Sequence, residues 1–259
     1  MSNIWLNALM STVIVSAISL IGVSLFALKS DKLQRSLLLL MSFSVGAMLG
    51  NAFFHLLPEA YFHLKPANLT SWLILGGFMV FFLVDQLLHS HQNSKARDTT
   101  KMRPYKKVKT YGYLSLYADG IHNFTDGILI GAAWIFSPEL GFATTVTVIL
   151  HEIPQEISDF GILLKAGFSK EKALLYNFIV ATTAILGTVL ALWIGHELEH
   201  FSIYILPIAG GGFIYLATTS LLPEILKNTK ENNWIVYILI VLLGLCMMYY
   251  FSLHGSHQH

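Results

Sequence analysis

The chain has 259 residues, of which 54% are hydrophobic and only 12% are charged. Soluble domains typically carry about 25% charged residues, so this composition excludes an ordinary water-soluble protein. The formal net charge of +1 gives no sign of a nucleic-acid partner. The apolar residues occur in runs of about 20, which match the roughly 30 Å hydrocarbon core of a bilayer. The sequence therefore predicts an all-α integral membrane protein whose main partner is the lipid bilayer.

Eight apolar runs are predicted to be transmembrane helices, and together they form a single transporter-like domain over residues 1–259. The first run has no Lys or Arg before its apolar core, as a cleaved signal peptide would need, so we expect it to be retained as a span. The predicted spans cover residues 5–28, 36–58, 70–89, 111–136, 141–164, 172–195, 203–226 and 233–253.

The basic residues lie almost entirely in alternate loops. Of the 16 Lys and Arg residues, 15 fall in loops one, three, five and seven, and only Lys65 falls in loop two. By the positive-inside rule, the odd-numbered loops are cytoplasmic and both termini lie outside. The longest loop, residues 90–110, is polar and basic and is predicted to be flexible. This charge bias is compatible with a bacterial plasma membrane or a eukaryotic one, and the compact loops, with no long extracellular domain, favour a bacterial one. We therefore expect the plasma (inner) membrane.

A short motif occurs twice in the chain. The sequence Leu-Leu-Pro-Glu stands at residues 56–59 in the second span and at residues 221–224 in the seventh. These spans are the middle members of the first and last groups of three, and the predicted orientation makes them run in opposite directions. Such inverted repeats are common in transporters. We therefore predict an inverted repeat of spans 1–3 and 6–8 around spans 4 and 5, although a four-residue match also arises by chance.

The fourth span carries ionisable residues that are costly in hydrocarbon. In the segment YADGIHNFTDGILIG, Asp119, His122 and Asp126 are spaced i, i+3 and i+7, which places them on one helical face. Asn123 lies beside His122. Ionisable residues inside a membrane are functional candidates because they need a partner, a ligand or water.

The fifth span carries a second such cluster. In the segment HEIPQEISDFG, His151 and Gln155 share one helical face, and Glu152, Glu156 and Asp159 form the adjoining face. Inert buried hydrogen bonding is the simpler interpretation for a single intramembrane His or Asp. It fits poorly with this many polar groups on two consecutive spans.

The two clusters are predicted to meet at the middle of the membrane. His122 lies about 16 Å from the inner end of its span, and His151 lies at a similar depth from the outer end of an antiparallel neighbour. The connection between these spans is short, around Ser137. Within the fifth span, Pro154 cannot donate a hydrogen bond to the Leu150 carbonyl, so we expect a kink and a freed oxygen atom beside the site.

Nitrogen and oxygen donors of this kind indicate a transition-metal site. Mixed imidazole and carboxylate ligands suit Zn²⁺, Fe²⁺, Mn²⁺ or Co²⁺ better than Mg²⁺, and the absence of cysteine ligands disfavours Cu⁺. A proton pathway is the alternative interpretation of the same cluster. The candidate metal-binding residues are His122, Asn123, Asp126, His151, Glu152, Gln155 and Glu156.

The motifs HNFTDG at residues 122–127 and HEIPQE at residues 151–156 resemble the signatures of the ZIP (Zrt-, Irt-like) metal transporter family. They are most similar to the branch whose fifth span reads HEIPHE. The likeness extends to eight spans, outside termini, a long cytoplasmic loop after span three and the repeated Leu-Leu-Pro-Glu. It implies a paired metal centre between spans four and five, moved as one helical group slides against another. The resemblance implies one metal among His122, Asp126, His151 and Gln155, and a neighbouring metal among Asn123, Asp126, Glu152 and Gln155.

Gln155 departs from the pattern of that branch, which has a second histidine at this position. An amide oxygen is a weaker, neutral ligand than an imidazole nitrogen. The departure leaves open the metal preference and whether both positions fill together. We expect Zn²⁺ as the transported ion, with Fe²⁺, Mn²⁺ and Cd²⁺ as alternatives, and no catalytic cofactor.

The leading hypothesis is a transporter that performs no chemical reaction and imports a divalent metal ion toward the cytoplasm. One alternative is a proton-coupled carrier of another solute. Another is an intramembrane metallohydrolase, because His151-Glu152 begins like the HExxH zinc motif, but Gln155 stands where that motif needs its second histidine. The sequence leaves the oligomeric state open, a homodimer included.

Overall fold

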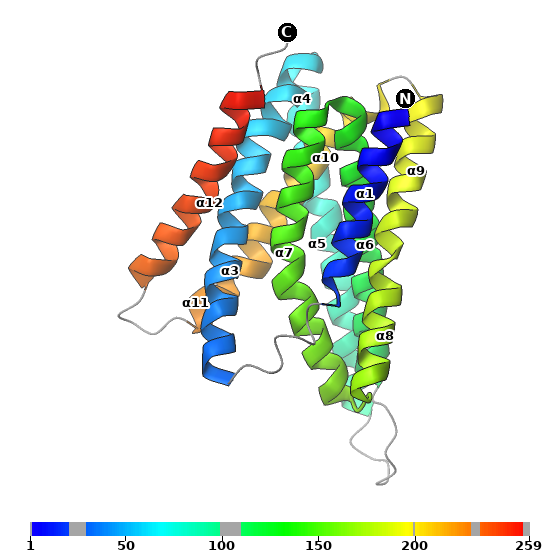
Figure 1. Ribbon diagram of the computed structural model, residues 1–259, viewed down its shortest axis with the longest axis vertical. Helices are drawn as coiled ribbons and strands as arrows, with labels where there is room; N and C mark the ends of the chain where they lie inside the picture. The colour runs from blue at the N-terminus through cyan, green and yellow to red at the C-terminus, as the bar shows by residue number, and fades with distance from the viewer. Residues whose placement is uncertain (1, 21–29, 99–109, 199, 229–233, 256–259) are drawn as a thin grey trace.

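The computed structural model describes residues 2–20, 30–98, 110–198, 200–228 and 234–255, and every regular element in these ranges is a helix (Figure 1). The predicted all-α class is therefore confirmed. The elements are α1 (Ser2–Ile18), α3 (Ser30–Asn51), η1 (Ala52–Leu56), α4 (Leu57–His63), α5 (Ala67–Asp98), α6 (Thr110–Phe136), α7 (Pro138–Ala166), α8 (Lys170–Ala181), α9 (Thr183–Glu197), α10 (Phe201–Tyr215), η3 (Leu216–Leu221), α11 (Leu222–Asn228) and α12 (Trp234–Gly255); η1 and η3 are π-helical turns that continue the helices before them.

Among the residues that the structure describes, five helical runs are long and apolar enough to cross a bilayer, judged by length and composition. Helix α1 is apolar but shorter. Helices α6 and α7 are long enough but not apolar enough to be among the five, because they carry the ionisable residues of the two polar segments. The five runs are Arg35–His63, Ala67–Val84, Lys170–Glu197, Phe201–Lys227 and Trp234–Leu253.

Two helix ends differ from the sequence prediction. Helix α1 ends at Ile18, and residues 21–28 of the predicted first span lie outside the described ranges. Helix α5 continues to Asp98, well past the predicted start of the loop at residue 90. The segment after residue 90 is rich in Gln, Lys, Ala and Arg and has no Gly or Pro before Pro104, so its composition favours helix. Residues 99–109 of the predicted loop lie outside the described ranges.

Helices α3 and α12 pack so closely that only glycine fits between them. A Cβ atom added at Gly46 of α3 would meet the carbonyl oxygen of Val241, and one added at Gly244 of α12 would meet the carbonyl oxygen of Phe43. Small residues allow helix backbones to approach in this way, which replaces the hydrophobic driving force that a lipid environment lacks. We call this contact the α3–α12 seam.

Helices α5 and α10 form a second seam of the same kind. A Cβ atom at Gly77 of α5 would meet the Ile208 carbonyl oxygen, and one at Gly211 of α10 would meet the Ile74 carbonyl oxygen. The α6–α9 contact is also close, because Gly187 of α9 lies against the backbone of Phe124 on α6. These three seams fix the positions of the longer helices.

The helices fall into two groups that meet beside the polar segments. Helices α3, α5, α10 and α12 are joined by the first two seams, whereas α1, α6, α7, α8 and α9 pack on one another. The groups touch mainly where α3 lies against α7 and α10 lies against α6. Fully buried apolar side chains fill this boundary, including Met48, Ile130, Val148 and Phe213. Helix α1 begins and α12 ends at the same end of the bundle (Figure 1).

Candidate metal centre

Helices α6 and α7 form an antiparallel hairpin with a sharp turn. Ser137 is the only residue between them, and its side-chain oxygen accepts a hydrogen bond from the Leu140 backbone N–H at 3.1 Å. Pro138 at the first helical position and Glu139 in the first turn complete a favourable helix start. The short turn holds the two polar segments at the same height, as the sequence predicted.

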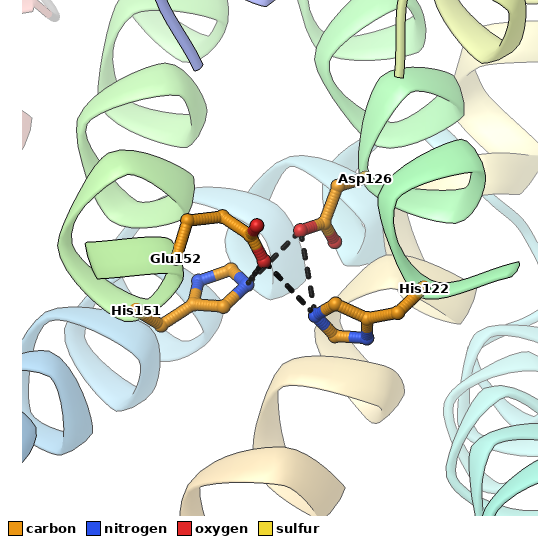
Figure 2. Close-up of side chains that lie close together, drawn as sticks. All are labelled: His122, Asp126, His151 and Glu152. Carbon is orange, nitrogen blue, oxygen red and sulfur yellow. Dashed lines mark hydrogen bonds and ion pairs between the residues drawn. The ribbon is translucent and has the colours of Figure 1, made fainter. Parts of the chain in front are cut away.

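Four side chains from this hairpin converge on one point (Figure 2). His122 Nε2 lies 3.6 Å from Asp126 Oδ2 and 3.3 Å from Glu152 Oε1. His151 Nε2 lies 3.0 Å from Asp126 Oδ2 and 3.7 Å from Glu152 Oε1. All four donor atoms lie within 4.8 Å of one another. Two imidazole nitrogens therefore alternate with two carboxylate oxygens around a common centre.

These separations fit a small tetrahedral cation. Zinc bonds nitrogen and carboxylate oxygen at about 2.0–2.2 Å, so donor atoms around a tetrahedral zinc are about 3.3–3.6 Å apart. The four nitrogen–oxygen separations run from 3.0 to 3.7 Å. A displacement of a few tenths of an ångström would complete the geometry, so the donor set fits zinc both in chemistry and in size.

The four side chains are buried with atoms that lack hydrogen-bond partners. Asp126 and Glu152 are fully buried, His151 is 2% exposed, and the His122 side chain is 14% exposed. Asp126 Oδ1, His122 Nε2 and both carboxylate oxygens of Glu152 make no hydrogen bond within the described part of the chain. Buried polar atoms without partners are costly, and a bound cation would satisfy several of them at once.

A backbone contact sets which nitrogen of His151 faces the centre. His151 Nδ1 lies 3.0 Å from the carbonyl oxygen of Thr147, one turn earlier on α7. A carbonyl only accepts, so Nδ1 carries the proton of this hydrogen bond, and Nε2 is the ring nitrogen that faces Asp126 and would bind a cation at the centre. Metal-binding histidines are commonly oriented by such a contact.

Pro154 leaves a carbonyl group free next to the cluster, and a side chain from another helix contacts it. Helix α7 continues through Pro154, which has no N–H for the Leu150 carbonyl. Ser44 on α3 donates to that carbonyl at 2.6 Å and also lies 2.8 Å from the Leu40 carbonyl oxygen. The sequence predicted the freed oxygen atom but not Ser44, because residues about a hundred positions apart share no local signal.

The remaining predicted ligands surround the four-residue cluster. Asn123 is fully buried, and its Nδ2 donates to Asp119 Oδ1 at 2.8 Å. Glu156 is 1% exposed and accepts a short hydrogen bond from Asn177 on α8. Gln155 is half-buried and lines a neighbouring cavity. The structure thus brings Glu152 next to His122 and His151, and places Gln155 to one side.

One aromatic residue beside the cluster was not predicted from the sequence. Phe213 on α10 is fully buried and packs edge-on against His151, with ring centroids 6.1 Å apart. It closes the side of the cluster that faces the other helical group. In sequence it is one of many apolar residues in a glycine-rich span, so no pattern singles it out.

Comparison with known proteins gives consistent matches over nearly the whole chain. The family model described as "ZIP Zinc transporter" matches residues 2–107 and 89–252. Zinc transporter ZIP13 of Danio rerio is 31% identical, over 86% of this chain and 78% of its own length. Zinc transporter SLC39A7 of Rattus norvegicus is 30% identical, over 95% of this chain and 72% of its own length. Zinc transporter YKE4 of Saccharomyces cerevisiae is 29% identical, over 85% of this chain and 72% of its own length.

Proposed function

Because this chain belongs to the ZIP zinc transporter family, we propose that it carries Zn²⁺ across a membrane through the centre formed by α6 and α7. The observation that supports this proposal best is the buried four-residue cluster, in which two nitrogen and two oxygen donors surround one point at separations suited to zinc. Membership of a transporter family also agrees with the expectation that the protein is not an enzyme.

The proposal includes a second metal position beside the first. Glu152 Oε2, Asn123 Oδ1 and Glu156 Oε1 are buried oxygen atoms without hydrogen-bond partners in the described ranges. A second cation would use these oxygen atoms, with the Glu152 carboxylate bridging the two ions. Gln155 would then flank the pair and would contribute less than a histidine at that place.

The membrane topology in this proposal has eight crossings: α1, α3 with α4, α5, α6, α7, α8 with α9, α10 with α11, and α12. Both termini would face outward from the plasma (inner) membrane, with the basic loops inside, so that import runs toward the basic end. The start of α1 and the end of α12 at one end of the bundle support an even number of crossings (Figure 1).

Three features support the inverted repeat. The π-turn η1 ends at Leu56 and η3 ends at Leu221, which are the first residues of the two Leu-Leu-Pro-Glu motifs. In both copies, a seam glycine precedes the motif by the same interval, Gly46 in α3 and Gly211 in α10. The two helices run in opposite directions through the bundle (Figure 1). The pairs α3–α12 and α5–α10 would then be equivalent, because each packs the second span of one repeat against the third span of the other.

Metal flux into sealed proteoliposomes tests the proposal directly. We expect saturable Zn²⁺ uptake by the purified full chain, and none by empty vesicles. Competition by Fe²⁺, Mn²⁺ and Cd²⁺ would rank the metals, and a comparison with and without a pH gradient would detect proton coupling. If none of these four ions enters the vesicles, the protein is not a divalent metal transporter.

A further inference from the structure

A cavity of about 320 Å³ lies beside the four-residue cluster, between the two helical groups. Its apolar walls come from α5 and from α10 with η3, including Val84 and Tyr215. Its polar wall comes from the hairpin of α6 and α7. His122 and Gln155 reach it from the centre, so the cavity is continuous with the proposed transport site.

Two further carboxylates line the cavity, displaced from the centre toward one end of the bundle. Asp119 precedes His122 by about one turn on α6, and Asp159 follows His151 by about two turns on α7. Since the two helices are antiparallel, both shifts lead toward the end where α7 finishes and α8 begins. This is the basic, proposed cytoplasmic end.

Asp119 is buried, yet one of its oxygen atoms has no hydrogen bond. The residue is 3% exposed, and its Oδ1 accepts from Asn123 at 2.8 Å. Its Oδ2 makes no hydrogen bond of ordinary geometry in the described ranges, although the Gln155 side chain lies beside it. A carboxylate oxygen left this way in a cavity wall is suited to a cation.

Asp159 and Ser115 complete the polar wall. Ser115 is buried, and its hydroxyl donates to Asp159 Oδ1 at 2.9 Å. The Asp119 and Asp159 carboxylates line the same cavity, so two acidic groups face one enclosed space. Among the described residues that line this cavity, none is a Lys or Arg that would neutralise them.

We propose that Asp119 and Asp159, with the Ser115 hydroxyl and the Gln155 amide oxygen, form a separate divalent-cation site in this cavity, through which metal leaves the central cluster. The inference rests on the proposed transport function and adds a binding position to it. All donors here are oxygen atoms, whereas the centre has two imidazole nitrogens. Oxygen-only sites hold zinc less firmly than sites with histidine.

A weaker site on the basic side would help release. A permeating ion must bind well enough to leave water and weakly enough to move on, and successive sites of decreasing affinity satisfy both conditions. Two carboxylates beyond the centre attract the ion as it leaves His122 and His151. The charged donors of the two positions differ, so substitutions that remove the donors of the centre leave the Asp119 and Asp159 carboxylates in place.

Mn²⁺ binding to the full-length protein tests the site, because Mn²⁺ accepts oxygen ligands and its free form is quantified by electron paramagnetic resonance. The background variant is His122→Ala/His151→Ala/Glu152→Gln, which removes the nitrogen donors of the centre and the carboxylate that would bridge to the second metal position. We expect this variant to retain a Mn²⁺ site, and we expect adding Asp159→Asn to weaken it by roughly tenfold or more, as loss of a ligand usually does. Asp159 is chosen because Asp119 also supports Asn123.

The matched control is Glu171→Gln in the same background, which removes an exposed acidic residue at the same end of the bundle, at the start of α8. We expect it to leave Mn²⁺ binding unchanged. The inference is overturned if the background variant binds no Mn²⁺. It is also overturned if Asp159→Asn and Glu171→Gln have the same effect on Mn²⁺ affinity.

A measurement on the native protein tests the cavity site even if a variant fails to fold. Anomalous diffraction from crystals soaked in Mn²⁺ is expected to show one ion within about 2.0–2.6 Å of oxygen atoms of Asp119 and Asp159, in addition to density at the centre. Density confined to the centre would refute this site while leaving the transport proposal standing. Absence of Zn²⁺ uptake by the native protein would instead refute the transport proposal.

Discussion

The α6–α7 hairpin and the α3–α12 seam differ in what lies between their helices. In the seam, glycine lets backbone meet backbone, with Gly46 against the Val241 carbonyl group. In the hairpin, histidines and carboxylates are buried, and several of their polar atoms have no hydrogen-bond partner among the described residues. The seam thus needs no further partner, whereas in our proposal a bound metal ion supplies the partners that the hairpin lacks. Substitutions in the two regions should therefore act on different properties.

Removing a metal-binding side chain from the hairpin should have the largest effect, which we expect on Zn²⁺ binding and transport. We expect His151→Ala to weaken Zn²⁺ binding by about 100-fold or more, because it deletes one of four ligands and leaves the Asp126 carboxylate without its nearest partner. Binding by calorimetry and uptake into vesicles would measure this. The control is His196→Ala, an exposed histidine at the end of α9 that is not part of the four-residue cluster, and this variant should bind zinc normally. Equal behaviour of the two variants would contradict the site.

Adding one methyl group to a seam should instead lower stability. Gly77→Ala places a Cβ atom against the Ile208 carbonyl oxygen, and overpacking of this kind costs about 1–3 kcal/mol. The adjacent Gly76 has nothing within 4 Å of such an atom, so Gly76→Ala should be neutral or slightly stabilising. Thermal unfolding of both variants in detergent would separate them. Matching midpoints would mean that the α5–α10 seam is looser than described.

A histidine at position 155 should raise the Zn²⁺ affinity of the hairpin rather than disrupt the site. We expect Gln155→His to tighten Zn²⁺ binding by about tenfold, because an imidazole nitrogen is a better zinc ligand than an amide oxygen. The same residue is also the fourth donor of the proposed cavity site, so Mn²⁺ affinity there should fall. Ser158→His adds a histidine to an exposed face of α7 and serves as the control. Unchanged zinc affinity in Gln155→His would show that residue 155 does not reach the metal.

The smallest effect is expected where the two helical groups meet. Ser44→Ala removes the hydroxyl that contacts the Leu150 carbonyl, and hydrogen bonds between membrane helices contribute about 0.6 kcal/mol on average. We expect a loss of stability of about 1 kcal/mol, since the carbonyl beside Pro154 then lacks a donor. Ser42→Ala removes a hydroxyl that bonds only within its own helix, to Leu38, and should cost less. Unfolding midpoints of the two variants compare these hydroxyls directly.

The sequence was a good guide to helices and a partial guide to the site. Apolar run lengths predicted the helices because a bilayer core imposes a minimum length on any span. Spacing on α6 and α7 predicted which residues face the hairpin, because helical periodicity is local. It did not rank the donors on α7: the expected first metal position includes Gln155, and among the His, Asp and Glu side chains the structure brings Glu152 to that point. That choice depends on the rotation of α7 against α6.

The sequence by itself determined the membrane class, the family resemblance, the helical segments and the polar composition of the fourth and fifth spans, because these depend on runs, periods and motifs along the chain. Tertiary structure alone decided which donors meet, that Ser44 contacts the carbonyl group freed at Leu150, and that Asp119 and Asp159 share a cavity. Contacts between distant helices depend on how glycine and bulky residues let whole backbones approach, and no local pattern in the chain encodes that distance.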